Sequence, residues 1–378
     1  MRATCRFVFL AVLGLTLGLA PRAGVCGDAD SKVLDKVRSI TKGETIQFEA
    51  TAFIRYWVQL QDSHVEGAGE NEPYTNSFEI WRLYFGPKVQ VTPWLLLRVT
   101  ADVGSDSSAT SGEADDGHTH KVPGSPRYGF FIKYAYAQLR FAPGLHLRIG
   151  SQANLYHEFN DKLWGGRYVA KNVGDEEQLW HSASLGLNLL YELPGEHGEI
   201  GVGFVNGSGY KKALDTDANK ELWVQAALSP FASLGDVARR FQLAMLLQYD
   251  VPVVSDADQH LLATALVGWK GKWVSGGYQF IANLDDLGGD GALGMGHGAY
   301  LRLLSPWKVG LLCRAAIWDA DTDQGDVQEK YEVLGGVFYS PLSFFEVALS
   351  ASGTWYSKLS GVEEEPDVRM LLSTQFAL

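Results

Sequence analysis

Between residues 45 and 378, two kinds of connection alternate along the chain, and this alternation constrains the fold more than any other feature. Sixteen runs of eight to seventeen residues place apolar and polar side chains at alternate positions, which is the period of a β-strand. After each odd-numbered run comes a longer polar segment, and after each even-numbered run before the last comes a short turn. The runs begin near residues 45, 76, 94, 127, 145, 180, 199, 219, 239, 259, 272, 294, 308, 330, 343 and 367.

Proline marks the short turns. Six of the seven turns contain one, at Pro93, Pro143, Pro194, Pro230, Pro306 and Pro341, and the seventh turn is Lys270-Gly271. Proline fixes φ and has no backbone N–H to donate to a sheet, so it is tolerated at a tight reversal and disfavoured inside a strand. The pattern therefore predicts that the short turns lie at one end of the sheet and the long loops at the other.

An even number of strands with this arrangement is typical of a transmembrane β-barrel. Lipid cannot hydrogen-bond to backbone N–H and C=O groups, so a spanning sheet must close on itself. We expect an all-β, antiparallel up-and-down barrel of about 16 strands, with short periplasmic turns and longer extracellular loops. A soluble β-sandwich is the alternative, but many runs reach the roughly nine to eleven residues that cross a bilayer, longer than typical sandwich strands.

The N-terminus has the layout of a secretory signal. Arg2 and Arg6 precede an apolar run from residue 7 to 20, and small residues follow around Gly27. We expect a signal peptide over residues 1–27, a periplasmic lead-in over 28–44 and the barrel over 45–378. Lipidation at Cys26 is an alternative fate for the N-terminus.

Charge and cysteine content limit the possible partners. Removing residues 1–27 would take away three arginines and no acidic residue, so the net charge of -12 would become -15. Such a charge argues against nucleic acid as a partner. Only Cys313 would remain, which cannot form an internal disulfide.

Arginines recur on the polar faces of the runs, which a barrel would turn toward its lumen. The predicted pore-lining residues are Arg55, Arg82, Arg98, Arg140, Arg148, Arg240, Arg302 and Arg314. Those on the first five runs would form a basic stripe facing Glu221, Glu332 and Glu346 across the pore. Charged rings and stripes set ion preference in channels, so the stripe favours anions. The alternative is that acidic residues neutralise the arginines and no selectivity results.

The longest loop, residues 154–179, predicts a constriction. Its length exceeds what a hairpin needs, so we expect it to fold into the pore and to bring Lys162, Arg167 and Lys171 with it. An extracellular loop without a role in conductance is the alternative. In the run that begins near residue 127 the alternation slips between Tyr134 and Leu139, which predicts a bulge and leaves the face of Lys133 undecided.

Three further motifs do not indicate metal binding, nucleotide binding or catalysis. "DDGHTH", residues 115–120, has metal-ligating residue types but is expected to be a loop tip. The glycines at 291–298 do not follow a buried strand into a helix, as a nucleotide-binding fingerprint would. His181-Ser182 lacks a third partner for nucleophilic catalysis. We therefore expect neither an enzyme nor a bound cofactor.

Several segments resemble the phosphate-selective porin O and P family of outer-membrane porins. They are "FEIWRLYFGPKVQVTPWLLLRVTAD", "KYAYAQLRFAPGLHLRIGSQANLYHEF" and the stretch that contains "FVNGSG", together within residues 76–231. The resemblance implies a sixteen-stranded, usually trimeric, anion-conducting porin. It also implies that Arg82, Arg140 and Arg148 line the lumen and that the loop from residue 154 forms the constriction.

The sequence thus predicts an outer-membrane porin for passive diffusion of small hydrophilic solutes, with a bias toward anions, including phosphate. We expect it to contact outer-membrane lipid and to assemble as a homotrimer. A surface barrel with binding or adhesive loops is one alternative. A sugar-type channel is another, because Trp57, Trp223 and Trp273 could offer aromatic surfaces to a solute.

Overall fold

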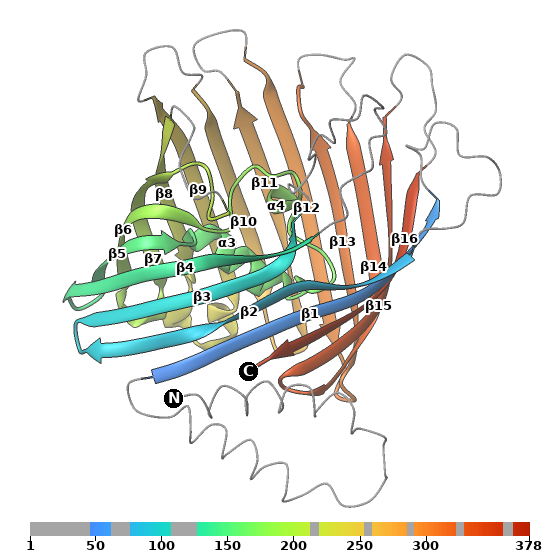
Figure 1. Ribbon diagram of the computed structural model, residues 1–378, viewed down its shortest axis with the longest axis horizontal. Coiled ribbons are helices and arrows are strands. Elements are labelled where there is room, and N and C mark those ends of the chain that lie inside the picture. Colours follow the sequence, from blue (N-terminus) through green and yellow to red (C-terminus); the bar gives the residue numbers. More distant parts are fainter. Residues whose placement is uncertain are drawn as a thin grey trace, which may run out of the picture. The chain divides into compact units, whose positions relative to one another are not determined.

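The computed structural model is a closed barrel of sixteen antiparallel β-strands (Figure 1). It describes residues 46–61, 76–106, 127–211, 219–252, 259–285, 291–322, 329–357 and 366–378. These belong to one compact unit that runs from residue 45 to 378. The predicted signal peptide (1–27) and lead-in (28–44) lie outside the described residues.

Consecutive strands pair with one another, and β1 closes the barrel on β16, with Thr51 opposite Ala377. The strands are β1 (Ile46–Gln61), β2 (Asn76–Thr92), β3 (Leu95–Asp106), β4 (Arg127–Ala142), β5 (Leu145–Gln152), β6 (Ser184–Leu193), β7 (Gly198–Asn206), β8 (Asn219–Leu228), β9 (Phe241–Pro252), β10 (Leu261–Lys270), β11 (Val274–Leu284), β12 (Leu293–Leu304), β13 (Val309–Asp319), β14 (Lys330–Leu342), β15 (Phe345–Tyr356) and β16 (Asp367–Ala377). The predicted fold class is confirmed. The largest difference among the strand starts is at β6, expected near residue 180 and observed at Ser184.

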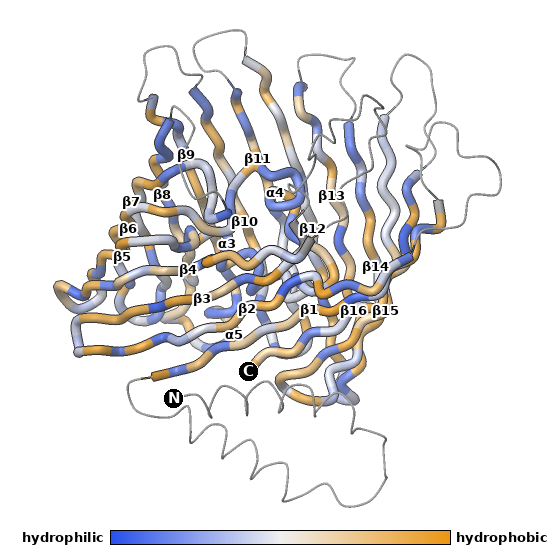
Figure 2. The backbone as a smooth tube through the Cα atoms, viewed as in Figure 1, coloured by the Kyte–Doolittle hydropathy of each residue, from blue (hydrophilic) through white to orange (hydrophobic). Residues whose placement is uncertain are grey.

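Alternate residues of each strand face outward and inward, as β6 illustrates. Leu185, Leu187 and Leu189 are 54%, 46% and 46% exposed, whereas Asn188 and Leu190 between and beyond them are fully buried. Figure 2 shows the corresponding alternation of hydrophobic and hydrophilic residues along the strands. The outward face is therefore apolar, as a lipid-facing surface requires. No helix in the described part of the chain is long and apolar enough to span a membrane.

Two of the predicted short turns differ from expectation. The β8–β9 connection contains Pro230 but continues through η2 (Ala232–Leu234) and α5 (Asp236–Arg239), so it is not a tight turn. Pro341 lies within β14, just before the turn, where the β14–β15 register shifts between Tyr339 and Leu342. A proline is tolerated there because the regular ladder is already interrupted. Between β6 and β7, Pro194 begins the short helix η1 (Pro194–Glu196).

Candidate functional site: the barrel lumen and its inner loop

The segment between β5 and β6, residues 153–183, lies inside the barrel and is called the inner loop below (Figure 1). It contains α3 (Leu155–Trp164) and α4 (Val173–Glu176). The side chain of Asn154 caps the start of α3 by accepting from the backbone N–H of His157, and Asn172 caps α4 in the same way. Gly165 ends α3 with φ 63°, a left-handed conformation that glycine adopts without strain.

Polar side chains of the inner wall hold α3. The backbone N–H of Leu155 donates to Oε1 of Gln225 on β8 at 2.7 Å. Thr264 on β10 donates to the hydroxyl of Tyr156 at 2.8 Å. Asn160 donates to Gln279 on β11 at 3.2 Å. Three strands thus fix one helix, which satisfies the polar groups that this buried contact would otherwise leave without partners.

The second half of the inner loop is held by β12, β13 and β14. The Tyr300 hydroxyl accepts from the backbone N–H of Val173 at 3.3 Å. Arg314 donates to the backbone carbonyl of Lys171. Lys330 binds Glu177 at 2.7 Å. The inner loop therefore spans the lumen from its own strands, β5 and β6, to the opposite wall.

Glycines on the inner wall leave room for the apolar side chains of the loop. A Cβ at Gly277 would lie 2.7 Å from Leu163, and a Cβ at Gly298 would lie 2.7 Å from Val173. Leu246, Leu262 and other inward residues are fully buried in the same region. This side of the lumen is consequently filled by the inner loop.

Seven of the eight predicted pore-lining arginines lie on strands and face inward, and five of these contact a carboxylate. The pairs are Arg55 with Glu79, Arg82 with Asp102, Arg98 with Glu49, Arg302 with Glu346, and Arg314 with Glu332. The carboxylates thus lie beside the arginines and not across the pore from them. Arg148 instead donates to the amide oxygen of Gln138 at 3.0 Å.

Two of the eight predicted arginines are exposed. Arg140 is exposed near the end of β4, opposite His146 of β5. Arg240 lies in the turn after α5, one residue before β9, and is also exposed. The structure therefore does not bring Arg240 together with the inward-facing arginines.

Aromatic rings support the guanidinium groups. Arg55 lies over Trp81 with 4.0 Å to the ring centroid, and Arg98 lies over Tyr134 at 4.6 Å. Arg148 lies 5.4 Å over Tyr136. Such stacking restrains the cation without neutralising its charge.

Lys133 is a lumenal cation that the sequence left unassigned. It is 5% exposed and lies over the rings of Tyr84 and Tyr134 at 4.5 and 5.4 Å. The β3–β4 register shifts between Thr100 and Ala101, opposite Lys133, so the predicted bulge exists and lies just before the segment where it was expected. The slip in alternation indicated the bulge, but it did not indicate whether Lys133 faces the lumen or the lipid.

A second missed residue is Tyr210, in the connection after β7. Its hydroxyl donates to Asp102, the partner of Arg82, and its ring packs edge-on against Phe131 at 6.4 Å. Nothing in the local sequence indicates this contact, because it joins residues more than a hundred positions apart.

The three predicted loop cations differ in environment. Lys162 is exposed, and Lys171 is half-buried. Arg167 contacts Asp175 and lies 3.7 Å from Asp161. Burial would lower the pKa of Arg167, but the two carboxylates outweigh burial and raise the pKa. Burial would likewise raise the pKa of Asp175, yet Arg167 lowers it, so both groups carry charge near neutral pH.

The inward side of β1–β5 and the inner loop differ in charge. Among the side chains that the structure describes, the inward side of β1–β5 carries seven basic residues and three carboxylates. The basic residues are Arg55, Arg82, Lys88, Arg98, Lys133, Arg140 and Arg148, and the acidic ones are Glu49, Glu79 and Asp102. The inner loop has five carboxylates and three cations: Glu158, Asp161, Asp175, Glu176 and Glu177 against Lys162, Arg167 and Lys171.

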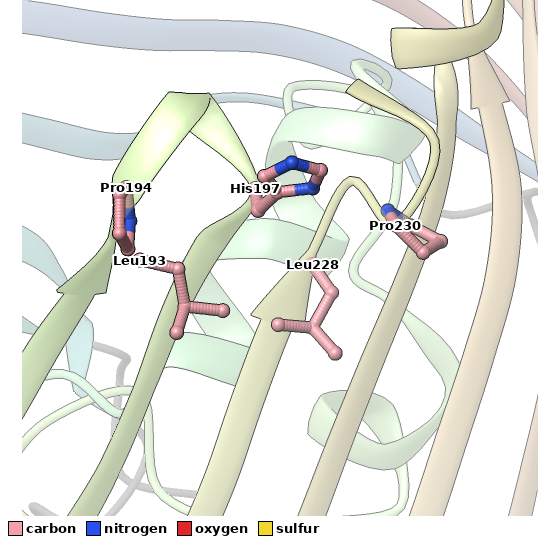
Figure 3. Close-up of a pocket in the computed structure, with 5 residues that line it drawn as sticks. All are labelled: Leu193, Pro194, His197, Leu228 and Pro230. Carbon is pink, nitrogen blue, oxygen red and sulfur yellow. The ribbon is translucent and has the colours of Figure 1, made fainter. Parts of the chain in front are cut away.

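The tryptophans considered for a sugar path do not come together. Trp223 is 1% exposed beneath the inner loop, Trp57 is half-buried on β1, and Trp273 is 43% exposed in the β10–β11 turn. The "DDGHTH" motif at 115–120 lies outside the described residues. A separate apolar pocket of about 390 Å³ lies among the turns, lined by Leu193, Pro194, His197, Leu228 and Pro230 (Figure 3).

No protein-family model matches the chain, and no curated protein matches it by sequence. Among solved structures, an anion-selective porin from Comamonas acidovorans superimposes with a TM-score of 0.61 at 10% identity, covering 88% of this chain and 99% of that chain. OmpF of Salmonella typhi, in complex with daunomycin, has a TM-score of 0.60 at 9% identity over 88% and 97% of the two chains. OprB of Pseudomonas putida at high pH has a TM-score of 0.59 at 9% identity over 91% and 97%.

These likenesses establish the fold. The chain has the closed barrel of the outer-membrane porins, at an identity too low to assign a solute. They do not assign the chain to the narrower family of phosphate-selective porins.

Proposed function

We propose that this protein is an outer-membrane porin through which small hydrophilic solutes diffuse passively. Its apolar outward face suits lipid, and its inward face carries the charged and polar side chains that an aqueous path requires. The inner loop narrows that path from the side of β8–β14, where its hydrogen bonds and its ion pair are made.

We further propose a mild preference for anions. The observation that carries this proposal is the excess of four basic side chains, seven against three, on the inward side of β1–β5. Fixed charge along a narrow path concentrates the opposite ion. The preference is expected to be mild because Arg55, Arg82 and Arg98 each contact a carboxylate. An anion-selective porin with the same fold has been solved, which agrees with this proposal.

A narrower proposal is that phosphate is the preferred anion. A guanidinium fork matches the oxygen atoms of phosphate better than an ammonium does, and Arg148 is held by a neutral amide, so its charge is not neutralised by a carboxylate. Together with the exposed Arg140 it offers the wall two guanidinium groups for an oxyanion. Phosphate should therefore reduce the chloride current at lower concentration than acetate does.

Reversal potentials across a planar bilayer under a KCl gradient test the anion preference. The double variant Arg140→Ala, Arg148→Ala should move the reversal potential toward cation preference. The matched control is Arg239→Ala, Arg240→Ala, which removes the same charge from the β8–β9 connection. A wild-type channel that prefers cations, or a control that shifts as far as the lumenal variant, would reject the proposal. A folded barrel without conductance would favour the surface-protein alternative.

For assembly, we propose the homotrimer that the family resemblance implies, embedded in outer-membrane lipid. Native mass spectrometry of detergent-extracted protein measures the number of chains directly. A monomer that conducts fully would contradict the trimer but not the porin function.

A further inference from the structure

His297 is an exception on the outward face of the barrel. It is the fifth residue of the twelve-residue strand β12. The glycines on either side of it face inward, because a Cβ at Gly296 would meet Trp318 and one at Gly298 would meet Val173 of the inner loop. Since side chains alternate along a strand, His297 faces outward.

Its partner is also on the outward face. Nδ1 of His297 lies 2.6 Å from the hydroxyl of Tyr278 on β11, and the ring centroid of Phe280 lies 5.4 Å from that of the imidazole. Tyr278 is 45% exposed. The hydrogen-bonded pair is called the Tyr278–His297 pair below.

No other outward position within the described strands resembles it. Elsewhere on the outward faces of the described strands, an acidic, basic or imidazole side chain occurs only at Lys220 and Asp319. Lys220 is the second residue of β8, and Asp319 is the last residue of β13. Ionisable side chains inside the hydrocarbon region are costly and normally find a partner in protein. His297, by contrast, lies four residues in from the start of its strand.

The Tyr278–His297 pair is not satisfied by itself, whichever way its protons are arranged. If the tyrosine donates to Nδ1, then the N–H at Nε2 has no acceptor among the described residues. If Nδ1 donates to the tyrosine oxygen, then the tyrosine O–H has no acceptor. One donor and one acceptor remain in both arrangements, so the pair is complementary to a second copy of itself.

The surrounding surface permits close approach. Ala299, opposite Tyr278 in the sheet, is exposed, and so are Ala265 on β10 and Ala315 on β13. Small side chains let two membrane-spanning surfaces come close enough for a polar contact. The small residues alone would identify nothing, but here they border an unsatisfied polar pair.

We propose that the outward face of β10–β13 around the Tyr278–His297 pair is a contact with a second copy of this chain, related by a two-fold axis along the membrane normal. Such an axis keeps the depth of every residue, so the pair meets the partner subunit's Tyr278 and the partner subunit's His297 at the same level. A three-fold axis would instead bring the pair against a different face of the neighbouring copy, which does not carry the same pair. The contact joins two copies, whether each stands alone or belongs to a trimer formed through a different face.

This inference rests on the membrane placement in the proposed function and not on conduction. Cross-linking in native membranes tests it. Ala299→Cys, combined with Cys313→Ser to remove the other outward thiol, should give disulfide-linked pairs on oxidation, because a residue near the axis comes within disulfide distance of its copy. The control Val202→Cys, Cys313→Ser places an exposed thiol on the outward face of β7 and should stay monomeric.

Adding His297→Ala to the Ala299→Cys variant should reduce the cross-linked fraction several-fold while leaving heat-modifiable folding unchanged. Absence of cross-linking at Ala299→Cys would overturn the proposal and indicate that lipid or a different protein covers this face. Equal cross-linking at Val202→Cys, or no effect of His297→Ala, would overturn it as well. A conductance measurement on the same variants keeps this outcome separate from the test of porin function.

Discussion

At Gly298 the inner wall of β12 has no side chain, and the space is taken by Val173 of α4. A methyl group there would lie 2.7 Å from Cγ2 of Val173, closer than carbon atoms tolerate. Gly298→Ala should therefore push α4 away from the wall at a cost of about 1–3 kcal/mol, which is the usual penalty for overpacking. Single-channel recording should show added flicker or an altered conductance.

Gly335→Ala is the matched control, because Gly335 faces outward on β14 and nothing lies within 4 Å of its added Cβ. Identical traces for Gly298→Ala and the wild type would mean that the inner loop does not rest on this glycine.

His157 of α3 should make the inner loop sensitive to acid. Burial lowers the pKa of His157 below its ordinary value of 6.5, and Arg167 and Lys133 act in the same direction, although Asp161 and Asp175 raise it. Above pH 6.5 His157 is already neutral in the undocked loop, so burying it costs no deprotonation free energy. As the pH falls from 6.5 toward the lowered pKa, the undocked loop binds the proton more readily, and the docked loop is destabilised. Channel flicker should increase in that window.

His157→Gln removes the titrating group and keeps a polar side chain of similar length at that position, so the acid-induced flicker should disappear. The same flicker in His157→Gln and the wild type would assign the acid response to another group. The variant should be compared at pH 7.5 as well, where both proteins are expected to behave alike.

At the level of elements, the strands were predictable and the pairs between them were not. The period of two locates a strand from local sequence alone, and the start of β16 at Asp367 was placed correctly because Val368 to Phe376 alternate regularly. The contact of Arg98 with Glu49 joins β3 to β1 across the intervening β2 and depends on register and rotamers that local sequence does not contain. Arg240 was misplaced because α5 interrupts a connection expected to be short.

The inner loop is an element whose presence was predicted from length but whose helices were not. In α3, Leu155, Phe159 and Leu163 recur every four residues, but the helix is short and contacts several strands of the curved wall, including β8, β10 and β11. The glycines that receive it, such as Gly277 and Gly298, are the signal that sequence inspection could have used. Alternate glycines on one face of a strand indicate that something approaches the backbone there.

Replacing residues 156–178 with a short Gly-Ser linker should widen the path. The barrel is closed by its own strand pairs and does not need the loop for closure. Single-channel conductance should rise and ion preference should change, because five carboxylates and three cations leave the lumen. Apolar residues such as Leu262 and Leu266 would become exposed to water, so a lower thermal stability is also expected. An unchanged conductance would show that the loop does not limit the current.

For the whole molecule, closure between β1 and β16 is the decisive contact. Truncation after residue 366 removes β16 and leaves the N–H and C=O groups of β1 and β15 without partners in lipid, where each costs several kcal/mol. The truncated chain should fail to show heat-modifiable mobility on a gel and should be degraded by protease. Deletion of Leu378 alone is the control. It removes the hydrogen bonds that residue 378 makes with Ala50 but keeps the pairing of Ala377 with Thr51, so a folded barrel is expected. A protease-resistant barrel without β16 would mean that the wall can close by another pairing, and the assignment of sixteen strands as the closed unit would then be wrong.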